Sequence, residues 1–401
     1  ILLAGMLWMV LFGRGDRVVT DVDQSAEAWP ANGPEELWQT EVQRGYAGPL
    51  IHEGSVLLMD REGDRTDVVR RLSMEDGRED WRYSYPAPGR MQYPGGRSTP
   101  ATDGERVYTI GVFGHIKAVT FDEGEPVWDA HLVDDWGGNS PTYGVSQSPL
   151  LHGDMLVVMP WGARASVVAY DKRTGRVRWT TPNPTGRGLD YQSPVAMELD
   201  GRTIVLCSGR HGFTIGVDAA SGEQLWSYGG RRGSFYSDWH VPSPVAVPGG
   251  RVLLTGGYRA GAALLQIEEQ GDGYGVRELW RNSSMGTKLG PALYHDDHFY
   301  ANSFDVRAGL RCVDLQGDVV WESSRKFEMG SILIADDRLF IVDGRNGDLY
   351  MVEATSERYN VLARAEGVLS GRQLWGPMAY SRGRLLLRDH ERLVCLDVKG
   401  E

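Results

Sequence analysis

The stretch that decides the fold is Ala169–Trp179, which reads AYDKRTGRVRW. It ends an apolar run, turns at a glycine and reaches a tryptophan four residues after that glycine. The same phrase returns along the 401-residue chain, with its tryptophan at spacings of 41 to 54 residues. A period of this length indicates stacked structural repeats. The recurring tryptophans are Trp38, Trp81, Trp128, Trp179, Trp226, Trp280 and Trp321, with an apolar residue near Leu362 in the remaining unit.

Two other landmarks recur in the same register, and together they define eight units. One is a glycine four residues before the tryptophan, and the other is a proline that opens most units. We expect the tryptophans to be structural, each with its ring packed between neighbouring sheets and its N–H bonded to a partner. The glycines are Gly77, Gly124, Gly175, Gly222 and Gly317. The prolines are Pro49, Pro100, Pro149, Pro194, Pro244, Pro291 and Pro377, and the seventh unit opens at Gly330 instead.

Each unit has the pattern of short β-strands. Met155–Met159 follows a turn, Ala165–Tyr170 is short and rich in β-branched residues, and Gly, Asp and Asn gather between such runs. Apart from the N-terminal segment, no run of ten or more residues has a convincing helical period. Eight units of about 46 residues predict an all-β fold, an eight-bladed β-propeller of four-stranded antiparallel blades. A solenoid is the rival, and it would need capping ends.

The two ends of the repeat region complement each other. Leu393–Glu401 matches Leu310–Asp318 and then stops before a tryptophan strand, whereas Glu35–Val42 is such a strand standing alone. We therefore expect the N-terminal strand to complete the last blade and close the ring, which removes exposed sheet edges. This assigns residues 35–401 to the propeller and residues 18–34 to a polar linker.

Residues 1–17 are expected to be a membrane anchor or the remnant of a signal peptide. Ile1–Phe12 is almost wholly apolar, although a bilayer span takes about 20 residues. The chain does not begin with Met, so we expect further sequence upstream, and the absence of an Ala-x-Ala-like site favours an anchor. The expected location is extracytoplasmic, in the periplasm or cell envelope, with the protein membrane-anchored or secreted.

Composition excludes one large class of function. The net charge is −12 and no run of Lys or Arg is present, which argues against nucleic-acid binding.

Cys207, Cys312 and Cys395 lie inside apolar runs and are expected to be core residues. No metal-binding set is predicted, because the Asp-Asp pair within His295–His298 recurs at the equivalent turn of the next unit.

The phrase at Ala169–Trp179 resembles the tryptophan-docking repeat of the quinoprotein-type, PQQ-like β-propeller family. Val217–Trp226 is a second close match, and Phe121–Trp128 and Val313–Trp321 are shortened versions. The resemblance extends from about residue 35 to residue 401. It implies one of two functions: a pyrroloquinoline-quinone (PQQ) dehydrogenase, or a non-catalytic propeller similar to BamB, a periplasmic scaffold of outer-membrane barrel assembly.

The dehydrogenase branch implies a vicinal cysteine pair over the quinone, calcium ligands and an aspartate base. The three cysteines here are 105 and 83 residues apart, so no vicinal pair exists, and no catalytic residue can be carried over. We therefore expect no cofactor and no catalysis, with PQQ and Ca²⁺ as the alternative.

One group of residues is a candidate binding face. Polar and aromatic residues stand just before the proline-led strands, and a propeller would gather such positions on one face around its central channel. That arrangement would suit a polar ligand or a protein partner. Alternatively, these side chains bond neighbouring blades and seal the channel. The candidates are Tyr93, Tyr143, Gln147, Asp190, Tyr191, Gln192, Asp238, Trp239, His240, Lys288, Arg372 and Trp375.

The sequence thus favours a non-catalytic extracytoplasmic scaffold or recognition module, associated with a membrane through its N-terminal apolar segment. Its partner would be a protein or a small polar ligand, bound by loops on a rigid frame. The first alternative is the extracytoplasmic sensor domain of a membrane receptor. The second is a PQQ-dependent oxidoreductase.

Overall fold

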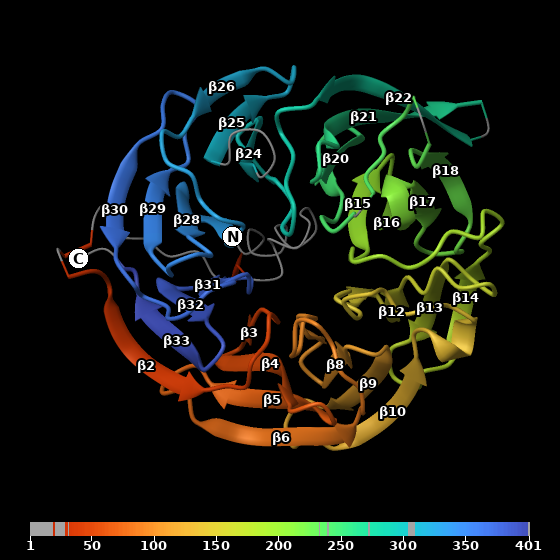
Figure 1. Ribbon diagram of the computed structural model, residues 1–401. Coiled ribbons are helices and arrows are strands. Elements are labelled where there is room, and N and C mark those ends of the chain that lie inside the picture. Colours follow the sequence, from red (N-terminus) through yellow and green to blue (C-terminus); the bar gives the residue numbers. More distant parts are fainter. Residues whose placement is uncertain are drawn as a thin grey trace, which may run out of the picture.

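The computed structural model describes residues 19–20, 29–30, 32–231, 233–238, 240–271, 273–303 and 309–399. Eight β-sheets stand around a central axis like the blades of a propeller (Figure 1). Within each blade the four repeat strands pair antiparallel, in sequence order except in blade 8, where the N-terminal strand β2 follows β33. The predicted fold class is confirmed, including the number of blades.

The first four blades follow one another along the chain. Blade 1 is β3 (Leu50–His52), β4 (Ser55–Glu62), β5 (Thr66–Ser73) and β6 (Glu79–Pro86). Blade 2 is β7 (Ala101–Thr102), β8 (Arg106–Ile110), β9 (His115–Thr120) and β10 (Pro126–His131). Blade 3 is β11 (Leu150–His152), β12 (Met155–Val158), β13 (Val167–Asp171) and β14 (Val177–Thr181). Blade 4 is β15 (Val195–Leu199), β16 (Arg202–Ser208), β17 (Thr214–Asp218) and β18 (Gln224–Tyr228).

The other four complete the ring. Blade 5 is β19 (Val245–Val247), β20 (Arg251–Gly256), β21 (Gly261–Gln270) and β22 (Gly273–Asn282). Blade 6 is β23 (Leu293–His295), β24 (His298–Ser303), β25 (Gly309–Asp314) and β26 (Val319–Glu322). Blade 7 is β27 (Ile332–Ala335), β28 (Arg338–Val342), β29 (Leu349–Glu353) and β30 (Val361–Ala365). Blade 8 is β31 (Ala379–Ser381), β32 (Arg384–Arg388), β33 (Arg392–Asp397) and β2 (Glu35–Glu41).

Blade 8 closes the ring as the sequence predicts. In Figure 1 β2, in red, lies beside β33, in blue. Glu35 pairs with Asp397 and Glu41 with Arg392, and the Val42 N–H donates to the Glu391 carbonyl at 2.8 Å. A further strand, β1 (Val19–Thr20), pairs in parallel with β31, inside the stretch expected to be a linker. A strand of two residues is too short to show an alternating pattern, so the sequence contains no indication of this pairing.

The repeat tryptophan and the repeat glycine meet across neighbouring blades. Trp128 of blade 2 donates its indole N–H to the Lys172 carbonyl of blade 3 at 2.9 Å. Its ring also covers Gly175, where an added Cβ would lie 2.7 Å from the ring. Gly175 has a φ of +70°, a conformation that favours glycine. The same contact joins Trp38 to Gly77, Trp81 to Gly124, Trp179 to Gly222 and Trp280 to Gly317.

Two tryptophans depart from this contact. Trp321 keeps its hydrogen bond, to the Thr355 carbonyl at 2.8 Å, although blade 7 has no glycine at the turn. The Trp226 N–H has no acceptor among the described residues, and the indole lies against Gly216 of its own blade. The expectation of a bonded N–H is therefore wrong for Trp226. The reason is that β21 and β22 form a long hairpin where the other blades have a tight turn.

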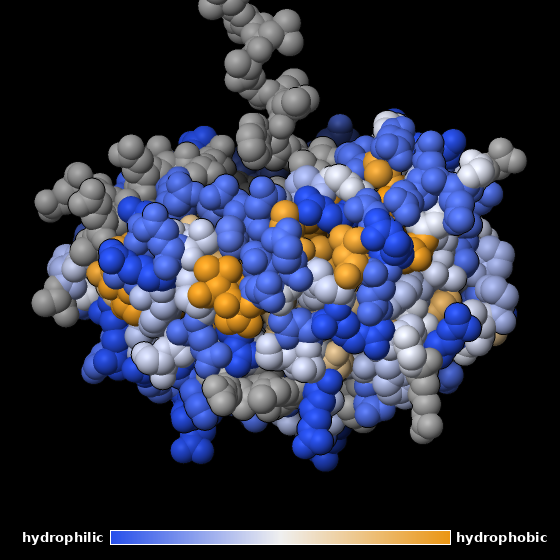
Figure 2. All heavy atoms as spheres, turned by 90° about the horizontal axis from the view of Figure 1, so that it is seen from above, coloured by the Kyte–Doolittle hydropathy of each residue, from blue (hydrophilic) through white to orange (hydrophobic). Residues whose placement is uncertain are grey.

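The core lies between the blades, and the outside of the ring is polar. Buried apolar side chains of adjacent blades form continuous clusters. Figure 2 shows a side that is mainly hydrophilic, with separate hydrophobic patches. Exposed apolar residues on the outer strands include Val127, Val177, Val319 and Val361.

Among the described residues, no helix is long and apolar enough to cross a membrane. The segment expected to be an anchor or signal-peptide remnant, residues 1–17, lies outside the described residues.

Substitution of Gly175 by Ala tests the contact between blades. Gly153 is a matched control, because it also has a positive φ, +54°, but an added Cβ there meets nothing within 4 Å. Both substitutions strain the backbone by about 1 kcal/mol. Only Gly175→Ala also pushes the ring of Trp128 away. We expect it to lower the free energy of unfolding by at least about 1 kcal/mol more than Gly153→Ala, measured by urea unfolding. Equal losses would contradict the docking contact.

Candidate functional site

The candidate residues lie at one end of the propeller, which we call the connection face. It is formed by the connections between the last strand of one blade and the first strand of the next, and by the loops between second and third strands. Tyr93 lies between β6 and β7, Tyr143 and Gln147 between β10 and β11, and Asp190, Tyr191 and Gln192 between β14 and β15. Asp238 and His240 lie between β18 and β19, Lys288 between β22 and β23, and Arg372 and Trp375 between β30 and β31. Trp239 lies outside the described residues.

Four of the candidates belong to one aromatic cluster. The ring centroids of Tyr93 and Tyr143 are 5.6 Å apart, those of Tyr93 and Trp375 are 5.8 Å apart, and those of Tyr143 and Tyr191 are 6.1 Å apart. Tyr46 joins the cluster by stacking on Trp375 at 5.6 Å. Sequence reasoning missed Tyr46, although it stands three residues before Pro49, as Tyr191 stands before Pro194.

Arg97 lies against this aromatic cluster. Its guanidinium is 5.3 Å from the centroid of the Tyr46 ring and donates to the Tyr93 carbonyl. Burial lowers the pKa of Arg97 to about 10, against the opposing influence of the nearby tyrosines. The side chain is therefore cationic at neutral pH, and its Nε has no acceptor among the described residues.

A second group of candidates is buried and joins parts of the frame. Gln147 donates to the Met159 carbonyl at 3.0 Å and accepts from the Met159 N–H at 2.7 Å. Gln192 donates to the His240 carbonyl, and the His240 N–H donates to an Asp190 carboxylate oxygen at 3.2 Å. The Gln192 and Asp190 contacts join the connections that precede blades 4 and 5, whereas the Gln147 contacts lie within blade 3. Burial lowers the pKa of His240 to about 4 and raises the pKa of Asp190 to about 7.

The remaining candidates stand apart from both groups. Asp238 and Arg372 are exposed. The Lys288 ammonium is 4.9 Å from the centroid of the Tyr258 ring.

A cavity of about 700 Å³ opens beside the aromatic cluster on the same face. Tyr46 connects the two, because its hydroxyl donates to Gln373 Oε1 at 3.5 Å and its ring lies 5.1 Å from that of His390. We call this space the arginine cavity. It is lined by Arg44, Glu328, Arg345, Arg372, Gln373 and His390.

Hydrogen bonds fix the loops that line the arginine cavity. The Gly344 N–H donates to the Glu328 carbonyl at 2.9 Å, and the Leu374 N–H donates to the Gly344 carbonyl at 3.0 Å. His390 Nε2 lies 3.1 Å from the Arg372 carbonyl. Gln373 is held at a φ of +59°, which is uncommon for a residue other than glycine.

Among the described residues that line the arginine cavity, positive charge exceeds negative charge. Arg44, Arg345 and Arg372 are exposed, and none of them forms an ion pair with a described residue. Glu328 is the one acidic residue of the lining. Burial and the nearby Arg44 lower the pKa of His390, so the imidazole is neutral at pH 7.

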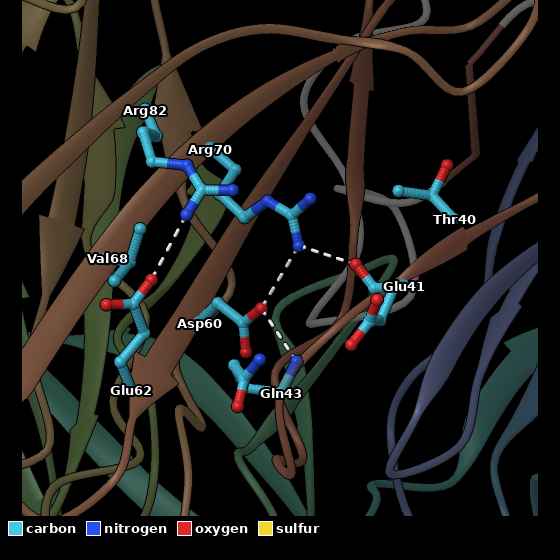
Figure 3. Close-up of a pocket in the computed structure, with 8 residues that line it drawn as sticks. All are labelled: Thr40, Glu41, Gln43, Asp60, Glu62, Val68, Arg70 and Arg82. Atoms are coloured by element: carbon cyan, nitrogen blue, oxygen red, sulfur yellow. Dashed lines mark hydrogen bonds and ion pairs between the residues drawn. The ribbon is translucent and has the colours of Figure 1, made fainter.

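A second cavity, of about 330 Å³, lies where β2 meets blade 1 (Figure 3). Its arginines are paired. Arg70 is 3.3 Å from Asp60 and 2.6 Å from Glu79, and it donates to the Glu41 carbonyl. Arg82 is 3.1 Å from Glu62. Burial acts to raise the pKa of Glu79, but hydrogen bonds from Arg82 and Arg70 bring it below its usual value. This cavity therefore lies at the junction that closes the ring, and the protein's own carboxylates pair with its arginines.

The residues present do not fit a calcium-bound quinone. Across the described ranges, no three His, Cys, Asp or Glu side chains are grouped so that they could hold a metal ion. Cys207, Cys312 and Cys395 are free and buried in three different blades. We derive no step through that cofactor.

Comparison with known families agrees with the fold. The family described as outer membrane protein assembly factor BamB matches residues 5–139 and residues 90–323, which together exceed half of the chain. The chain belongs to this family.

Solved structures share the propeller of this BamB-family chain at low sequence identity. BamB from Moraxella catarrhalis is 15% identical, with a TM-score of 0.61 over 90% of this chain and 98% of that one. The computationally designed Ika8 protein is 10% identical, with a TM-score of 0.61 over 90% and 99%. Quinohemoprotein alcohol dehydrogenase ADHIIG from Pseudomonas putida HK5 is 12% identical, with a TM-score of 0.51 over 96% and 79%. At such identities the similarity concerns the fold alone.

A curated relative has a different domain context. The serine/threonine-protein kinase AfsK of Streptomyces griseus is 29% identical over 174 residues, or 41% of this chain. The match spans 20% of the kinase's length.

The buried Asp190 gives a pH prediction. Its folded pKa of about 7 lies above the ordinary value of about 3.9, so the folded state holds a proton that the unfolded state releases. Stability from this group is present below about pH 4 and is lost as pH rises to about 7. Asp190→Asn can still accept from the His240 N–H and does not titrate. We expect it to be more stable than wild type at pH 8, by up to about 4 kcal/mol, and similar at pH 4.

Thermal unfolding across this pH range measures the effect. Asp238→Asn, at an exposed position of the same connection, is the control and should leave the pH profile unchanged. A parallel profile for Asp190→Asn and wild type would contradict the assignment.

Proposed function

We propose that this BamB-family propeller is a non-catalytic scaffold that binds a protein partner on its connection face. The observation that carries the proposal is the aromatic cluster of Tyr46, Tyr93, Tyr143 and Trp375 beside a cavity whose three arginines form no ion pair with a described residue. Tyr, Trp and Arg are the residues enriched where protein interfaces concentrate their binding energy. The rigid frame keeps them in place without a partner.

We further propose an extracytoplasmic location in the cell envelope. The support is the description of the family as an outer membrane protein assembly factor. Attachment to a membrane through Ile1–Phe12 stays a prediction, because that segment lies outside the described residues.

A second candidate function is a sensor domain, in which the connection face binds a ligand and an attached domain responds. The specific observation in its favour is the match to AfsK, which is a protein kinase. The match covers a fifth of that kinase, so the kinase activity itself is not transferred to this chain.

Site-specific photocrosslinking tests the scaffold. A benzophenone amino acid at Thr142, which is exposed beside the aromatic cluster, should crosslink in cells to one defined protein. The control is Thr174, equally exposed on the turn between β13 and β14 at the opposite end of the propeller. Mass spectrometry of the adducts identifies the partner. Equal adducts from both positions, or none from Thr142, would count against the proposal.

Titration with PQQ and Ca²⁺ separates the scaffold from an oxidoreductase. We expect no saturable change in absorbance and no alcohol- or sugar-dependent dye reduction, because the cysteines and carboxylates are not placed for that cofactor. Saturable binding with dye reduction would replace the scaffold proposal by an oxidoreductase.

A further inference from the structure

The arginine cavity differs in charge from the rest of the molecule. The chain carries a net charge of −12, yet three arginines converge here with one carboxylate, Glu328. Counting His390 as neutral, the lining has a charge of +2. In the other described cavity, Arg70 and Arg82 are already bound by carboxylates of the protein. The contrast indicates that the arginine cavity takes its anions from outside.

The lining is more suited to a peptide than to a bare phosphate. Guanidinium groups bind carboxylates in a bidentate manner. Glu328 stands among the arginines, and its carboxylate can accept a backbone N–H of a bound chain, a donor that a bare phosphate does not offer. Gln373 accepts from Tyr46, and its amide nitrogen is not used in any hydrogen bond within the described part of the chain. The cavity thus offers cations, a neutral donor and an acceptor together.

The volume of the arginine cavity and the aromatic residues beside it also favour a peptide ligand. A volume of about 700 Å³ falls within the range of about 300–1,000 Å³ that is typical of ligand pockets, and it can hold a few residues of an extended chain. Tyr46 and Trp375 form an aromatic wall next to the cavity, linked through the contacts of Tyr46 with Gln373 and His390. Such a wall can pack against the apolar parts of neighbouring peptide residues. Hydrogen-bonded loops keep the arginines in position beforehand.

We propose that the arginine cavity binds an acidic segment of the partner protein, with the carboxylates of successive Asp or Glu residues held by Arg44, Arg345 and Arg372. This proposal rests on the scaffold function above and specifies the chemistry of its partner. The acidic surface elsewhere repels such a segment, so the cavity also sets where on the propeller it docks.

A labelled hexaglutamate peptide tests the proposal by fluorescence anisotropy on the full chain. We expect saturable binding that weakens with added salt, and no binding of hexaglutamine. Arg345→Gln/Arg372→Gln should weaken hexaglutamate binding about tenfold or more. The matched control is Arg173→Gln/Arg176→Gln, which removes two exposed arginines near the opposite end of the propeller that form no ion pair with any described residue. The control should bind as wild type does, and both variants should keep the wild-type melting temperature.

Three results of the binding experiments would overturn the proposal. They are no saturable binding of hexaglutamate, equal weakening by both double variants, and binding of citrate in the cavity without binding of hexaglutamate. The last result would assign the cavity to a free small carboxylate. Photocrosslinking from Thr142 to a partner without an acidic segment would end this proposal and leave the scaffold function standing. Loss of the Thr142 adduct altogether would instead remove the scaffold function.

Discussion

The contact between a tryptophan ring and a glycine of the neighbouring blade is the interaction on which the rest of the propeller depends. At Trp128 and Gly175 the ring occupies the space that a Cβ would need, and its N–H satisfies a carbonyl of the adjoining turn. Each contact therefore sets the position of one blade against the next. A ring of eight blades closes only if these steps are consistent, and β2 then pairs with β33 to complete the last blade.

Blade 5 shows what happens when the contact is lost. Its long hairpin of β21 and β22 replaces the glycine turn, and Trp226 has no acceptor for its N–H in the described structure. Other contacts hold this junction, among them the hydrogen bond between the Tyr228 hydroxyl and Glu278. The ring thus tolerates junctions that lack the full contact, because five junctions retain it.

Residues at equivalent sequence positions of the connection face have two different roles. Some hold the frame together, and others lie at the proposed binding site. Between blades 2 and 5, Gln147, Gln192 and His240 are buried and form hydrogen bonds that hold the frame, and Gln192 Oε1 and His240 Nδ1 have no partner among the described residues. Around blade 8, the aromatic cluster and the arginine cavity leave polar groups without partners among the described residues. What distinguishes the second region is the cavity, because polar groups that face a cavity can be satisfied by a ligand. The proposed binding site therefore lies on that side of the face.

The sequence by itself determined the fold, because a glycine and a tryptophan recur at a fixed spacing in five of the eight units, and the tryptophan alone recurs in two more. Blade number and closure by Glu35–Val42 follow from that spacing. The sequence also indicated that the polar residues in the connections between blades share one face, because each of them precedes the first strand of a blade. It could not separate Tyr143, in the aromatic cluster, from Gln147, buried four residues later. Only tertiary structure decided this, because burial depends on the neighbouring blades. The arginine cavity joins Arg44 to Arg345 and Arg372, which are brought together by ring closure and not by any local pattern.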